Sequence, residues 1–182
     1  MGLSPWMGAI ELWQQKTGIA QPKDLSGYKV VERGIRFEPA LREMYKAQHP
    51  DADVEYHAYD VLYQADRPWL AATLDGEVTE SGQKGVLEIK TATCARKADY
   101  DKWRDAIPQN YYVQTLHQLL ATGYDFVDVY AALFGLCGDI QIKEYRIQRT
   151  ERESDMAWLL ERETDFWDRV KRGVMPAQTI LI

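Results

Sequence analysis

Residues 85–93 of the chain read GVLEIKTAT. β-Branched and aliphatic residues dominate this stretch, which begins with a glycine and ends with threonines, a composition typical of a buried β-strand. Successive side chains of a strand point to opposite faces of the sheet, so Glu88 and Lys90 share one face. Because an unpaired buried charge is costly, that face is either a functional site or an exposed edge.

Length and composition predict one globular domain over residues 1–182, since the chain is 46% hydrophobic and 12% aromatic. No apolar run reaches the roughly 18 to 20 residues that span a bilayer, and the first residues lack the basic start of a signal peptide. We therefore expect a cytoplasmic location and no membrane partner. Cys94 and Cys137 have no metal-type spacing, so we interpret both as reduced core thiols.

The order of elements predicts an α/β or α+β fold with one central mixed sheet of about five strands flanked by helices. Periodicity and turn residues predict helices over 6–17, 31–48, 109–122 and 151–172. The expected strands are 54–63, 68–76 and 85–93, which would form an antiparallel meander, followed by 125–135 and 140–148.

Asp75 is a second carboxylate that this arrangement would bring close to the first strand. It ends the apolar run LAATLDG, and a hairpin over ESGQKG would place it beside Glu88. Two neighbouring carboxylates repel each other unless a hard cation lies between them, and Mg²⁺ prefers oxygen ligands and retained water. Asp75 and Glu88, with the main-chain carbonyl of Ile89, are therefore a candidate Mg²⁺ site.

Lys90 would then orient a metal-activated water and stabilise developing negative charge, and would not serve to neutralise Glu88. The alternative is a solvated salt bridge between Glu88 and Lys90 on an exposed face, with Asp75 serving only as a turn residue. The spacing alone supports both interpretations equally.

Two helices offer further polar groups for the same site. Tyr111, Gln114 and Gln118 share one face of the 109–122 helix, which faces either the site or water. Glu38, just before Pro39, is either a surface residue or a third carboxylate for the metal.

A net charge of −6 argues against general binding of polyanions, so any contact with nucleic acid must be local. The basic run ARKADYDKWR is one local candidate, although charge runs are usually solvated surface. It contains Arg96, Lys97, Lys102 and Arg104.

Taken together, these motifs resemble the PD-(D/E)xK nuclease pattern, and more closely the phage lambda-type exonucleases, also called YqaJ-like viral recombinases. The resemblance covers nearly the whole chain, in the order of the family. Besides the opening GLSPWMGAIELWQQKTG and the closing GVMPA, the matching segments are Gly34 to Pro39, Thr73 to Gly76, Leu87 to Thr91 and Tyr111 to Gln114.

The resemblance implies a restriction-endonuclease-like core and assigns a role to each candidate residue. Asp75 and Glu88 correspond to the metal ligands, Lys90 to the catalytic lysine, Glu38 to an additional acidic residue, reaching the metal directly or through water, and Gln114 to a glutamine that contacts the site. DNA contacts are expected from the remaining candidates, which are Tyr111, Gln118, Arg96, Lys97, Lys102 and Arg104.

The implied reaction is Mg²⁺-dependent hydrolysis of linear double-stranded DNA from a free 5′ end, with Mn²⁺ as a substitute metal. It would leave 3′ single-stranded tails for a single-strand annealing partner. Relatives of this type form trimeric rings around DNA, and they are encoded by phages or prophages of bacterial hosts.

Two departures from the family pattern limit this transfer. Leu116 replaces the second glutamine of the family's helix, although Gln118 lies nearby. In relatives, a segment upstream of the GLSPW position holds the DNA 5′ phosphate. Either the sequence is truncated before this point, or end recognition comes from elsewhere, such as Lys97, Lys102 or Arg104. The alternatives are an endonuclease, a RecB-like nuclease subunit of a repair complex, and a DNA-binding relative that has lost cleavage.

Overall fold

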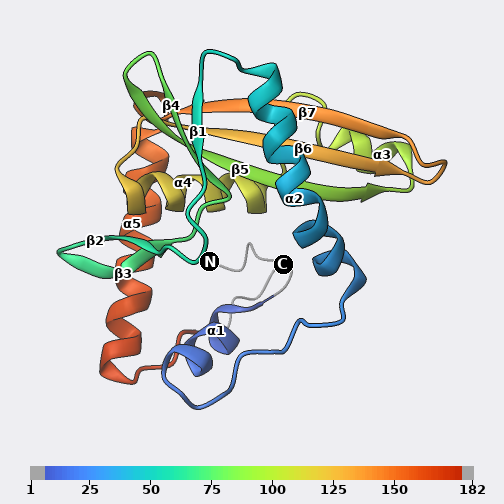
Figure 1. The fold of residues 1–182 in the computed structure, drawn as a ribbon. Coiled ribbons are helices and arrows are strands. Elements are labelled where there is room, and N and C mark those ends of the chain that lie inside the picture. The colour runs from blue at the N-terminus through green and yellow to red at the C-terminus, as the bar shows by residue number, and fades with distance from the viewer. Residues whose placement is uncertain (1–6, 178–182) are drawn as a thin grey trace.

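The computed structural model describes residues 7–177, and its centre is a mixed five-stranded sheet in the order β1-β4-β5-β6-β7 (Figure 1). Strands β5 and β6 pair in parallel, whereas every other pair in this sheet is antiparallel. This is the predicted fold class. The strands are β1 (Asp53–Glu55), β4 (Gly76–Glu80), β5 (Gln83–Cys94), β6 (Phe126–Gly135) and β7 (Ile140–Gln148).

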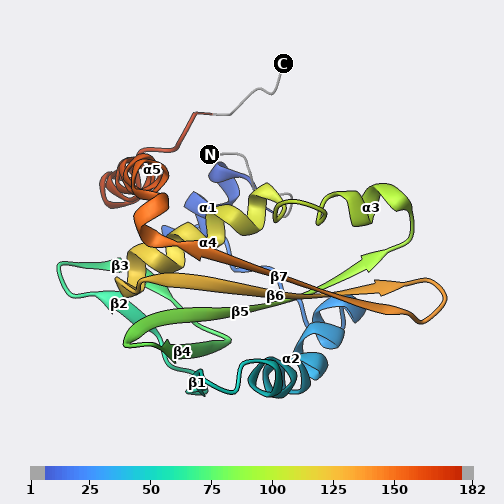
Figure 2. The same ribbon diagram turned by 90° about the horizontal axis from the view of Figure 1, so that it is seen from above.

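Helices cover both faces of the sheet. Helix α2 (Lys29–Gln48) packs on one face, and α4 (Gln109–Thr122) lies on the other with α5 (Glu153–Arg172) outside it (Figure 2). The short helices are α1 (Ala9–Lys16), which contacts α5, and α3 (Lys97–Asp101), which follows β5, with a 3₁₀ turn at Arg149–Glu151. None of the helices in the described part of the chain has the length and apolarity to span a membrane.

Strand alternation divides the core in two. On the α4 face, Val86 and Cys94 of β5 pack with Val127 and Val129 of β6 and with apolar residues of α4 and α5. On the α2 face, the alternate side chains of β5 and β6 pack with Leu41 and Tyr45 of α2; they include Leu87, Ile89, Phe126 and Tyr130. Glu88 and Lys90 therefore point towards α4, and their neighbours in sequence point towards α2.

The predicted three-strand meander over 53–93 is wrong in detail. Residues 54–63 form two short strands, β1 and β2 (Leu62–Gln64), and β2 pairs with β3 (Arg67–Ala72) in a separate two-stranded sheet. Residues 77–80, which lie between the expected strands 68–76 and 85–93, belong to β4. Strands of three residues carry too few side chains to show an alternation, so their breaks cannot be read from the pattern.

The bounds of the later helices and strands agree closely with those predicted from the sequence. Helix α4 occupies residues 109–122 and ends at Gly123, whose φ of 75° is the left-handed conformation that a helix-ending glycine adopts. Cys94 is buried as predicted, but Cys137 is exposed in the turn between β6 and β7, so the expectation of two core thiols is wrong for Cys137.

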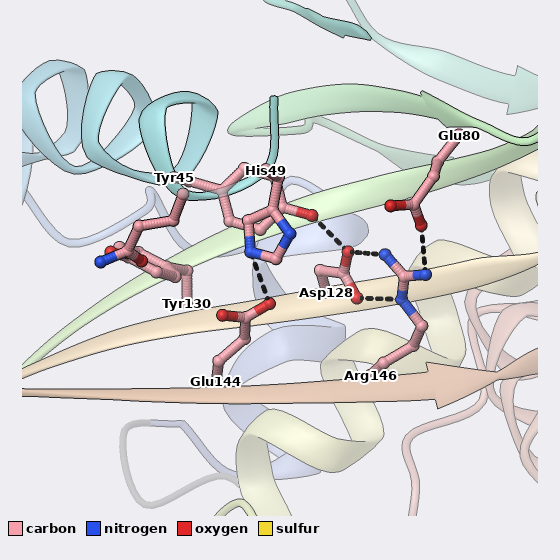
Figure 3. A network of polar contacts seen from close by, with 8 residues as sticks. Tyr45, His49, Glu80, Asp128, Tyr130, Glu144 and Arg146 are labelled. Atoms are coloured by element: carbon pink, nitrogen blue, oxygen red, sulfur yellow. Dashed lines mark hydrogen bonds and ion pairs between the residues drawn. The ribbon is translucent and has the colours of Figure 1, made fainter. Parts of the chain in front are cut away.

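A buried ionic network joins the sheet to the C-terminal end of α2 (Figure 3). Asp128 of β6 has no exposed surface and accepts two hydrogen bonds from Arg146 of β7, at 2.6 and 2.7 Å, and one from the Tyr45 hydroxyl. Arg146 also pairs with Glu80 of β4. The network ties β4, β6, β7 and α2 together on the face opposite α4.

Candidate functional site

The site forms where β4 stops pairing with β5. The β4–β5 hairpin turns at Ser81 and Gly82, and its last residue pair joins Gly76 to Leu87. Asp75 precedes β4 and therefore lies level with Glu88. Its Oδ2 atom accepts a hydrogen bond from the Ile89 amide at 2.7 Å, across the edge that β4 no longer covers.

The main-chain carbonyl of Ile89 points to the same edge. In a β-strand the N–H and C=O of one residue are directed to the same neighbour, and the Ile89 N–H is directed at Asp75. This backbone oxygen and the Asp75 carboxylate therefore lie on one side of β5, as the predicted ligand set requires.

Glu88 is only 2% exposed, and several side chains contact its carboxylate. Lys90 forms an ion pair with Oε1, which also accepts a hydrogen bond from Gln114 Nε2 at 2.7 Å. Gln118 donates its amide to Oε2. Gln114 and Gln118 of the polar stripe of α4 thus both bond to this carboxylate. Gln118 is buried, whereas Gln114 remains exposed, so the alternative of a stripe that faces only water is wrong.

Lys90 occupies the centre of this group. Its Nζ atom donates to Gln114 Oε1 at 3.0 Å and lies 4.9 Å from the centre of the Tyr111 ring. Lys90 and Glu88 form an ion pair, and the predicted role of Lys90 towards a metal-activated water stays a prediction. The pair is not the solvated one of the alternative, since the Glu88 side chain is 3% exposed.

The carboxyl group of Asp75 has a strongly raised pKa. Burial raises its pKa to about 7, and the negative charge of Glu88 adds to the rise, against the opposing hydrogen bond from the Ile89 amide. Two crowded carboxylates resist ionising together, and a cation between them relieves that cost.

Glu38 is placed differently from Asp75 and Glu88. Its Oε1 atom accepts a bond from Arg42 Nη2 at 2.7 Å, so the third carboxylate is already paired. Within residues 7–177, no three His, Cys, Asp or Glu side chains gather closely enough to form a metal site by themselves. The negative charge of Glu38 also contributes to the raised pKa of Asp75, and ligation of the metal by Glu38, directly or through a water, stays a prediction.

The remaining donors fit Mg²⁺. The ion needs only one or two protein carboxylates because it keeps several waters, and every donor at this edge is a hard oxygen. Gln118 Oε1 is buried beside Glu88 and has no hydrogen-bond partner among the described residues, so it is an acceptor to which a coordinated water could donate. The ligands would be Asp75, Glu88 and the Ile89 carbonyl.

The basic run lies around α3, beyond the end of β5. Arg96 and Lys97 are exposed, whereas Lys102 and Arg104 pair with Asp99 and Asp101, three residues before each. Exposed pairs of this kind separate at little cost, so these positions keep their predicted role as DNA contacts.

Sequence reasoning missed Arg42. This arginine is 6% exposed and contacts both Glu38 and the main chain of Asp75. The sequence did contain a signal that could have found it, since Arg42 lies four residues after Glu38 on the same helix.

His117 lies between the two site glutamines on α4 and joins this helix to its neighbours. Its Nδ1 atom lies 2.8 Å from Glu163 of α5, and its Nε2 atom lies 3.0 Å from the Ala71 carbonyl of β3. Burial lowers the pKa of the His117 imidazole, but the hydrogen bond and charge of Glu163 and the Ala71 carbonyl outweigh it, so the net shift is upward.

His117→Gln is expected to destabilise the protein by about 2 kcal/mol at pH of about 6, the range for a charged hydrogen bond. A histidine whose pKa is raised by folding contributes stability that is full below its unfolded pKa, about 6.5, and is lost as the pH rises through the folded value. Urea unfolding at pH of about 6 and about 9 measures this. A difference between wild type and variant that grows with pH would contradict it.

Three comparisons place the chain among known proteins. The model of the YqaJ-like viral recombinase domain matches residues 1–125. "Uncharacterized protein YqaJ" of Bacillus subtilis (strain 168) is 27% identical over 184 residues, which cover 97% of this chain and 52% of that protein. The chain thus spans about half the length of this curated relative.

The solved structures show the fold. An alkaline exonuclease of Laribacter hongkongensis, LHK-Exo, superposes with a TM-score of 0.66 at 18% identity, covering 91% of this chain and 79% of that one. The structure of LHK-Exo in complex with dAMP superposes with a TM-score of 0.56 at 19% identity, covering 92% and 85%. The predicted restriction-endonuclease-like core, a mixed sheet between helices, is the fold shared with these structures.

Proposed function

The chain belongs to the YqaJ-like viral recombinase family, and from this premise and the geometry of the site we propose that it is a Mg²⁺-dependent deoxyribonuclease. One observation carries the proposal. Glu88, which is almost fully buried, and Asp75, whose pKa is raised to about 7, meet at an open strand edge with Lys90 beside them. Two crowded carboxylates and a lysine suit phosphodiester hydrolysis better than they suit a structural salt bridge.

Each residue then has a chemical task. Asp75, Glu88 and the Ile89 carbonyl would hold the metal, which when bound would polarise a phosphoryl oxygen and lower the pKa of a bound water. Lys90, which pairs with Glu88, would present its ammonium to the phosphate and to the attacking water and stabilise developing negative charge there. Gln114, which contacts both Lys90 and Glu88, keeps the two within reach of each other.

Gln118 has a different role from the DNA contact that we predicted. It is 2% exposed and its amide donates to Glu88, so it supports this carboxylate from inside the protein. Partners that orient a metal ligand in this way keep its lone pairs aimed at the ion.

Exonucleolytic cleavage is the specific activity that we propose. The name of the structural relative, alkaline exonuclease, supports digestion from DNA ends, and the recombinase in the family's name supports a role in recombination. Digestion of linear duplex DNA from 5′ to 3′, which leaves 3′ tails, is proposed by resemblance to the phage enzymes. A trimeric ring and a single-strand annealing partner complete the proposal, by resemblance to the phage enzymes.

The test is digestion of one plasmid in linear and in covalently closed form, with Mg²⁺, Mn²⁺ or EDTA. We expect the linear form to be degraded with either metal, no product with EDTA, and intact closed circles. Separate 5′ and 3′ end labels then read the polarity. Nicking of the circles would favour an endonuclease, and DNA binding without metal-dependent product would favour a relative that has lost cleavage.

A further inference from the structure

Arg42 makes three contacts that converge on the site from different elements. Its Nε atom donates to the main-chain carbonyl of Asp75 at 2.6 Å, and its Nη2 atom donates to Glu38 at 2.7 Å. The guanidinium also lies 3.7 Å from the centre of the Tyr56 ring, in the loop after β1. The planar fork of an arginine allows these contacts to form together.

Asp75 is consequently fixed at two points. Its carbonyl oxygen is held by Arg42 of α2, and its carboxylate is held by the Ile89 amide of β5. Because Asp75 lies in the connection before β4, outside any strand, no ladder of hydrogen bonds fixes its backbone. Arg42 supplies the anchor that regular structure would otherwise provide.

We propose that Arg42 is the positioning residue of the metal site, which holds the Asp75 backbone so that its carboxylate faces Glu88. The same guanidinium keeps Glu38 out of direct ligation. This inference rests on the proposed function, since it concerns the metal that the nuclease would use.

The direction in which metal affinity changes when Arg42 is removed distinguishes a positioning role from a purely electrostatic one. Arg42 is a cation near a cation site, so if its charge were all that mattered, its removal would strengthen metal binding and would also free Glu38 as a ligand. If Arg42 positions Asp75, its removal weakens metal binding despite the gain in negative charge. Loss of a group that orients a metal ligand typically costs about 10- to 100-fold in affinity.

The experiment measures Mn²⁺ binding to the whole chain by electron paramagnetic resonance, without DNA. The variants are Arg42→Gln, Arg42→Lys and the double variant Arg42→Gln/Glu38→Gln, and circular dichroism reports whether each is folded. Arg36→Gln is the matched control because it removes the same charge from an exposed position on the same helix.

We expect at least about 10-fold weaker binding for Arg42→Gln and for the double variant, and less than about 2-fold change for Arg36→Gln. Arg42→Lys keeps the charge but cannot contact both partners at once, so it should also bind Mn²⁺ at least about 10-fold more weakly. If Arg42→Gln does not fold, the Mn²⁺ affinity of Arg42→Lys tests the positioning role.

Wild-type affinity in Arg42→Lys, or tighter binding by Arg42→Gln, would overturn the positioning role and leave the nuclease proposal standing. A wild-type protein that binds no Mn²⁺ would overturn both.

Discussion

Lys90→Ala is expected to slow Mg²⁺-dependent cleavage of linear duplex DNA by about 10²-fold or more, the usual cost of losing one group that stabilises transition-state charge. In the structure the Lys90 ammonium lies between Glu88 and Gln114, at the edge where Asp75 meets β5. No metal ligand is removed by the substitution. The loss should therefore appear in the single-turnover rate, measured on end-labelled DNA.

Mn²⁺ binding provides the second readout for this variant. Because Lys90 competes with a cation for Glu88, Lys90→Ala should bind Mn²⁺ at least as tightly as wild type while it cleaves far more slowly. Lys84→Ala is the control, since it removes a lysine from an exposed position of the same strand and should cleave within about 2-fold of wild type. A Lys90→Ala protein that cleaves at the wild-type rate would refute the catalytic role.

Arg146→Met is expected to lower the free energy of unfolding by about 3 kcal/mol, the largest stability effect that we predict. Asp128 has no exposed surface, and Arg146 donates both hydrogen bonds that neutralise its charge (Figure 3). Without the arginine the carboxylate stays buried, and among the described residues only the Tyr45 hydroxyl is left as its side-chain partner. Urea unfolding monitored by tryptophan fluorescence gives the difference.

Two controls define the cause of that loss. The double variant Arg146→Met/Asp128→Asn should be destabilised less than Arg146→Met alone, because no uncompensated charge is left inside. Arg169→Met removes the exposed pair with Asp165 on α5 and should cost no more than about 0.5 kcal/mol. Equal losses for Arg146→Met and Arg169→Met would show that burial of Asp128 is not the cause.

The accuracy of the sequence predictions followed the length of the elements. Helix α4 and the long strands β6 and β7 repeat their pattern often enough to be recognised, and they lie within a residue or so of their predicted bounds. Strands β1 and β2 have three residues each and were merged into one. The contacts of Asp128 with Arg146 and Tyr45 were not predicted, because a single polar residue in an apolar strand does not indicate which residues it will contact.

The sequence by itself determined that Glu88 and Lys90 share a face, because alternation along a strand is a property of the backbone. It also determined that Asp75 precedes Glu88 at hairpin distance and that Gln114 and Gln118 share a face of one helix. The tertiary structure alone decided that the α4 face covers Glu88, that Lys90 pairs with it, and that Arg42 holds Asp75. Those contacts depend on how separate elements pack, and local patterns carry no information about packing partners.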